Sequence, residues 1–130
     1  MIFTYIALAV FVYTVTYLWS EYGSLPDEMP VHYGIDGKPD QMGSKGMMWI
    51  LVGVGAVTVV IMFAIPFLLE EKNGMLALGV THLLCQLLFL YIIYKSIQIA
   101  RGQATGLGKE FFFLMVLVVV LPIALALIEK

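Results

Sequence analysis

The stretch Leu25–Lys45, LPDEMPVHYGIDGKPDQMGSK, is a polar segment in an otherwise apolar chain of 130 residues. It holds three of the five prolines, four of the nine acidic residues and one of the two histidines. The whole chain is 62% hydrophobic and only 12% charged, whereas a soluble domain carries about 25% charged residues. This composition indicates an integral membrane protein, and any specific chemistry is expected in the polar segment.

Four apolar runs surround this segment, and none contains a lysine, arginine, aspartate or glutamate. Each is near the length of about 20 residues that a helix needs to cross a bilayer. The runs cover residues 2–19, 47–69, 75–94 and 111–128. They predict an all-α integral membrane protein, a four-helix transmembrane bundle with an ordered polar loop at 20–46. We treat residues 1–130 as one multi-pass membrane domain.

The connections between the runs differ in length and charge. Residues 70–74 (EEKNG) predict a tight turn, and the third helix is expected to continue to about Ala100 before Gly102 ends it. The first and third connections carry five basic residues, against two on the other side. The positive-inside rule therefore favours a cytoplasmic polar segment, by a small margin.

Turn-forming residues dominate the polar segment. Asp36-Gly37 is a strong turn dipeptide, and we expect short extended arms at Met29–Tyr33 and Lys38–Met42 on either side of it. Prolines within the segment restrict the backbone further. These features predict an ordered cap on the helices rather than a flexible linker.

His32 has several carboxylates near it in the sequence. One hypothesis is a metal or proton-handling site built from His32, Asp36 and Asp40, since imidazole and carboxylate are ligands for zinc and related ions. The spacing matches no established metal motif. The competing interpretation, which we favour, is that these side chains form hydrogen bonds within the turns.

The polar segment resembles the small N-terminal membrane domain, of unknown function, of SdpI-type bacterial immunity proteins. The shared pattern is LPD, then P-x-H, then G-x-P-D, then a lysine before the next span. In this chain it consists of Leu25, Pro26, Asp27, Pro30, His32, Gly37, Pro39, Asp40 and Lys45. The resemblance covers about residues 2–69. It implies protection against a secreted peptide toxin, or signalling by holding a repressor at the membrane, with these loop residues as the binding surface.

Two polar residues lie inside the third apolar run. His82 and Gln86 are four residues apart, on one face of a helix. They form either a proton-relay or ligand site, or an interhelical hydrogen bond that fixes packing. We favour packing, because no span contains an acidic residue that would serve as a relay partner.

The leading interpretation is therefore an SdpI-like binding or regulatory membrane protein, not an enzyme, with no cofactor. Its expected partners are membrane lipid, a peptide or membrane protein, and a second copy of the chain. The net charge of −2 argues against nucleic acid. A metal-dependent membrane enzyme or accessory factor using His32 is the alternative, and a small transporter subunit is a weaker one.

Overall fold

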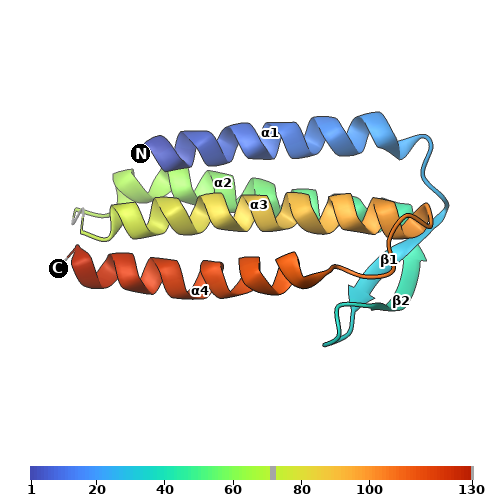
Figure 1. Cartoon of the computed structure of the whole chain (residues 1–130). Coiled ribbons are helices and arrows are strands. Elements are labelled where there is room, and N and C mark those ends of the chain that lie inside the picture. Colours follow the sequence, from blue (N-terminus) through green and yellow to red (C-terminus); the bar gives the residue numbers. More distant parts are fainter. Residues whose placement is uncertain (71–72, 130) are drawn as a thin grey trace.

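A computed structural model describes residues 1–70 and 73–129 of the chain. It is mostly helical and contains four long helices side by side (Figure 1). They are α1 (Ile2–Tyr22), α2 (Met48–Leu68), α3 (Met75–Ala100) and α4 (Lys109–Ile128). All four are long and apolar enough to cross a membrane. The predicted four helices are therefore confirmed, each with ends that differ by a few residues from those predicted.

The ends of the helices follow local signals in the sequence. The α3 helix reaches Ala100 as predicted, and Gly102 follows with φ of +72°, a conformation that costs glycine little. The predicted turn at 70–74 includes residues 71–72, which lie outside the described residues. The start of α1 and the end of α4 lie at one end of the bundle, opposite to the polar segment (Figure 1).

The polar segment folds into a β-hairpin, so the predicted all-α class is wrong in this respect. Strands β1 (Glu28–Tyr33) and β2 (Pro39–Ser44) pair antiparallel, close to the two expected arms. The turn between them closes with hydrogen bonds from Gly34 N to Lys38 O (2.8 Å) and from Lys38 N to Asp36 Oδ1 (3.1 Å). A short 3-10 helix, η1 (Lys45–Met47), leads into α2.

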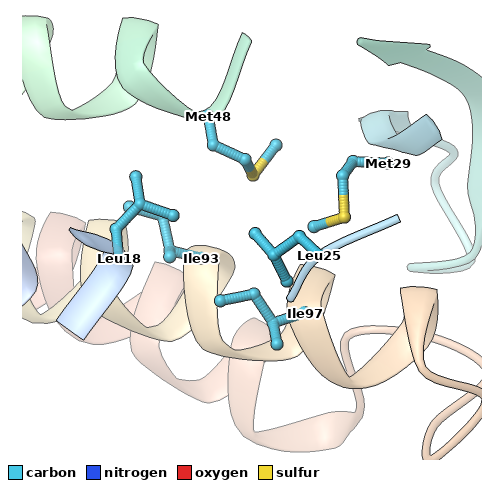
Figure 2. Packing of buried hydrophobic residues seen from close by; sticks show 6 residues of the cluster. All are labelled: Leu18, Leu25, Met29, Met48, Ile93 and Ile97. Atoms are coloured by element: carbon cyan, nitrogen blue, oxygen red, sulfur yellow. The ribbon is translucent and has the colours of Figure 1, made fainter. Parts of the chain in front are cut away.

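The α3 helix is the centre of the molecule. It contacts each of the other three helices and also β1. The main hydrophobic cluster lies where α3 approaches the polar segment, and Figure 2 shows Leu25 and Met29 pointing into the space between Met48 and Ile97. Leu18 and Ile93 complete the buried cluster. The hairpin is therefore packed on the bundle through an apolar underside.

Two polar contacts fasten the helices at opposite ends of the bundle. Near the polar segment, Arg101 donates to Glu21 Oε2 (2.6 Å) and to Ser24 Oγ (2.7 Å), which joins the ends of α3 and α1. At the other end, the Glu129 carboxylate accepts from Leu76 N (2.9 Å) and Ala77 N (3.2 Å). These N–H groups have no acceptor within the helix itself, so the negative charge of Glu129 beside them stabilises the start of α3.

We predict that Met29→Ala lowers the stability of the fold by about 2–5 kcal/mol, because it opens a cavity beneath the hairpin. The Met29 side chain has no exposed surface. The control is Met42→Ala on the other strand, where 48% of the residue is exposed. Denaturant unfolding in detergent micelles, followed by circular dichroism, measures both. Equal losses for the two variants would contradict burial of the hairpin's underside.

Candidate functional site

The polar segment is anchored to the bundle by its apolar residues. Leu25 is 5% exposed, and Met29 and Pro30 are fully buried. Proline suits this buried strand position because it has no backbone N–H that would lack a hydrogen-bond partner. The predicted binding residue Pro30 therefore lies on the packed face, where it supports the hairpin and is not accessible to a partner.

A hydrogen bond between side chains joins β1 to α3. The hydroxyl of Tyr33 is bonded to Ser96 Oγ, and Ser96 is fully buried. Burial raises the pKa of the Tyr33 phenol, while the hydrogen bond to Ser96 acts in the opposite direction. The phenol is therefore protonated at neutral pH and is available as a donor. This bond satisfies the polar group of Ser96, which is otherwise surrounded by protein.

The tip of the hairpin is attached to the connection between α3 and α4. Leu107 N donates to Gly37 O (2.9 Å), and Leu107 O accepts from the hydroxyl of Tyr91. Gly37 is buried, with φ of +77°, and a Cβ there would lie 3.5 Å from the ring of Phe112. A Cβ on Gly106 would lie only 3.0 Å from Gly37 O. Two glycines thus allow the backbones of the two connections to approach closely.

Lys45 fixes the C-terminal end of the polar segment, next to α2. Its ammonium group donates to Tyr22 O (3.2 Å) and lies 4.6 Å from the centroid of the Tyr22 ring. Its backbone N–H donates to Asp27 O (2.9 Å). Cation–π and hydrogen-bond contacts of this kind fix the end of α1 against the start of α2. The predicted binding residue Lys45 therefore has a structural role in this arrangement.

The opposite face of the hairpin is exposed and rich in acidic groups. His32 Nδ1 lies 2.6 Å from Asp40 Oδ1, with side-chain exposures of 65% and 51%. A carboxylate can only accept a hydrogen bond, so His32 Nδ1 is the donor in this pair. Ile35, at the turn, is 98% exposed. The other exposed residues of this segment are Pro26, Asp27, Glu28, Asp36, Lys38, Gln41, Met42 and Ser44.

The pattern of strand pairing brings His32 and Asp40 together. The register shifts on both sides of His32, so Val31 and Asp40 have no directly opposite residue in the ladder. Bulges of this kind redirect side chains that regular pairing would place elsewhere. Pro39 begins β2 opposite Tyr33, where the missing N–H is tolerated at the end of a short strand.

The structure brings together only part of the predicted metal site. Among the described residues, no three histidine, cysteine, aspartate or glutamate side chains form a group that could hold a metal ion. Within the proposed set, His32 and Asp40 are paired, and Asp36 Oδ1 accepts the Lys38 N–H of the turn. A metal site at His32, Asp36 and Asp40 stays a prediction.

His82 and Gln86 are both buried, and both face α2. Gln86 Nε2 donates to Gly55 O (3.1 Å) and to Thr58 Oγ1 (2.9 Å), both on α2. This is the kind of interhelical hydrogen bond that the sequence predicts for this pair. His82 Nε2 lies 3.3 Å from Gln86 Nε2. Both residues lie in the first half of α3, whereas the contact with β1 is made by Ser96 in its last turns.

Comparison with known proteins places the polar segment inside a recognised domain. Residues 5–56 match the profile described as Domain of unknown function (DUF1648). The matched region contains most of α1, the whole hairpin and the beginning of α2. No curated protein and no solved structure matches the chain. The α3 helix, which carries the contacts beneath the hairpin, lies beyond the matched residues.

Several residues of this site were not identified from the sequence. They are Tyr33, Ile35, Ser96, Arg101, Gly106 and Leu107. A weak signal existed for Ile35, which is an apolar residue within a polar turn. For Ser96 and Leu107, the partner is about 60 to 70 residues away in the sequence, and no local pattern indicates contacts at such separation.

We predict that Gly106→Ala weakens the attachment of the hairpin tip, because the added methyl group would press against Gly37 O. The expected cost is about 1–3 kcal/mol, the usual range for overpacking. The control is Gly23→Ala, since a Cβ there would meet nothing within 4 Å and φ is −64°. Hydrogen exchange of the Leu107 amide measures the effect. Unchanged protection in Gly106→Ala would contradict the tight contact.

Proposed function

We propose that this chain is a multi-pass protein of the bacterial cell membrane whose polar segment, Leu25–Lys45, is a recognition surface. The observation that carries the proposal is the contrast between buried and exposed residues in the hairpin. Met29, Pro30 and Tyr33 anchor it to the bundle, whereas His32, Asp40 and their acidic neighbours are exposed. A surface held rigidly before binding loses little entropy when a partner docks.

The resemblance to SdpI-type immunity proteins supports a specific form of this function. Such proteins protect the producing cell from a secreted peptide toxin, or signal by holding a repressor at the membrane. The match to the domain of unknown function includes the whole polar segment. We therefore propose that the partner is a peptide or another membrane protein that contacts the exposed face of the hairpin.

Charge indicates the chemistry of this partner. Asp27, Glu28, Asp36 and Asp40 are exposed, whereas the ammonium group of Lys45 is used at Tyr22. Lys38 is the one exposed basic residue of this segment. The face is therefore acidic, and a basic peptide is complementary to it. Complementary charge raises the rate of association and excludes partners of the same sign.

The two other functions have less support. A metal-dependent enzyme needs ligands that the described residues do not bring together at His32, and the polar groups between the helices are used mainly in packing. We therefore propose neither an enzyme nor a transporter subunit.

The side of the membrane that the polar segment faces is measured with Ile35→Cys in a Cys85→Ala background. Position 35 is 98% exposed and makes no contact in the hydrophobic cluster. From the charge distribution we expect a membrane-impermeant maleimide to label this cysteine only after lysis. Labelling in intact cells would place the hairpin outside, and capture of a secreted peptide at the cell surface would then be favoured over holding a cytoplasmic regulator.

Recognition is tested by removing one charge from the exposed face. Asp40→Asn keeps an oxygen acceptor for His32 but removes the negative charge. A susceptible bacterium that expresses the wild-type chain should survive a basic peptide toxin better than cells without it. We expect Asp40→Asn to reduce this protection about threefold or more.

The matched control is Glu70→Gln, which removes one exposed charge next to the end of α2 away from the hairpin. It should leave protection unchanged. Equal effects of the two substitutions would indicate a response to net charge alone. No protection by the wild-type chain against any basic peptide toxin would overturn the immunity form of the proposal.

A further inference from the structure

A groove lies on the surface of the bundle between α1 and α4, with α3 as its floor. Figure 1 shows α3 between these two helices, and each of them packs on it. The groove has a volume of about 380 Å³, which is within the usual range of ligand sites. Its lining consists of leucine and tyrosine side chains: Tyr13, Tyr17, Leu87, Leu90, Tyr91, Tyr94 and Leu114.

This lining suits a hydrocarbon chain. Its polar side-chain atoms are the tyrosine hydroxyls, and two of these are already used within the protein. Tyr91 donates to Leu107 O, and Tyr94 accepts from Gln98 Nε2 (2.8 Å). The rings of Tyr17 and Tyr94, with centroids 6.2 Å apart, join the α1 wall of the groove to its floor. A flexible apolar chain fills such a groove without burying an unpaired polar group of its own.

Helix lengths place one end of the groove at the membrane surface. The α3 helix has 26 residues and α4 has 20, so α3 is about 9 Å longer. Because Glu129, just after α4, is bonded to the first turn of α3, the extra length projects at the hairpin end. Lys95 lies five residues before Ala100, the end of α3, and is therefore near the level at which α4 begins. A helix of 20 residues just crosses the hydrocarbon core of about 30 Å, so this level is the boundary with the lipid headgroups.

The ammonium group of Lys95 has no anionic partner within the protein. It lies 5.9 Å from the centroid of the Tyr91 ring, which lines the groove one helical turn deeper in the bundle. Among the described residues Lys95 forms no ion pair, whereas Arg101 at the same end is bonded to Glu21. The Glu110 carboxylate, in the first turn of α4, is not within ion-pair distance of Lys95. A lysine stem can lie along apolar surface in this way while its charge reaches the interface.

We propose that the groove binds a phospholipid, with an acyl chain against the leucines and tyrosines and the phosphate paired with Lys95. The apolar lining accounts for the chain, and charge complementarity selects the phosphate. A neutral lipid such as diacylglycerol would fill the same lining but leave the ammonium group unpaired. The inference rests on the membrane setting of the proposed function, since that setting supplies both the ligand and the depth of Lys95.

Binding is tested by native mass spectrometry of the full chain released from detergent micelles. The probes are dioleoyl phosphatidylglycerol and dioleoylglycerol, which share both acyl chains and differ in the phosphate headgroup. We expect the first molecule of dioleoylglycerol to bind about tenfold more weakly, the value of one charge-assisted hydrogen bond. Equal affinities would overturn the proposal, and so would a dimer of the chain that retains no lipid.

The role of the charge is tested with Lys95→Gln, which removes the ammonium group and keeps most of the apolar stem. It should remove the preference for phosphatidylglycerol. The matched control is Lys109→Gln, which changes an exposed lysine at the start of α4 that does not line the groove. This control should keep the preference. Equal losses in the two variants would indicate attraction to net charge and overturn the assigned site.

The role of the groove is tested with Leu114→Trp, because the larger side chain would occupy the space of the acyl chain. It should abolish binding of both lipids. Val116→Trp is the control, since this residue of the same helix is 57% exposed and lies outside the lining. Circular dichroism establishes that both variants keep their helices. Unchanged binding in a helical Leu114→Trp variant would overturn the proposal.

None of these substitutions lies in the polar segment. A membrane-inserted chain without a preference for the phospholipid would therefore overturn this proposal alone. Failure of Asp40→Asn to reduce protection, with the lipid preference retained, would overturn only the proposed recognition by the hairpin. A chain recovered in the soluble fraction of the cell would overturn both.

Discussion

The burial of Met29 against the end of α3 is the contact on which the arrangement of the polar segment depends. A two-stranded hairpin is marginally stable alone in water, so it needs an apolar surface to pack on. Ile93 and Ile97 of α3, together with Leu18 of α1 and Met48 of α2, form that surface. Through this cluster the hairpin in turn joins the ends of three helices.

Residues beyond the matched region also hold the hairpin in place. The recognised domain ends at residue 56, but the hairpin is also attached through Ser96 and Leu107. The α3–α4 connection therefore determines how the tip of the hairpin is presented. In the proposed function, substitutions in this connection would change the accessibility of the exposed residues. They would alter no residue of the motif shared with SdpI-type proteins.

The polar groups of the hairpin and those between α2 and α3 differ in exposure. At the hairpin, the buried Ser96 hydroxyl is satisfied by Tyr33, and the acidic side chains lie on the exposed surface. Between α2 and α3, almost every polar atom is satisfied within the protein, and His82 Nδ1 is the exception among the described residues. An unsatisfied polar atom in an apolar setting is costly.

The sequence by itself determined the four helices, the extent of α3 to Ala100, the Asp36-Gly37 turn and its two extended arms. It also indicated the pairing of Gln86 with a neighbouring helix. These features follow from hydrophobic runs and turn chemistry, which act between residues close in the chain. Paired strands within an otherwise helical chain were only partly anticipated, since arms around a turn do not by themselves indicate a sheet.

Only the tertiary structure decided which residues of the polar segment face the bundle and which face outward. Pro30, Gly37 and Lys45 belong to the predicted binding set but have structural contacts, whereas Ile35 was overlooked and is almost fully exposed. The reason is that these contacts join separate parts of the chain: Gly37 contacts Leu107 in the connection after α3, and Lys45 contacts Tyr22 at the end of α1. Contacts at such separation are set by packing, which no local pattern of residue types encodes.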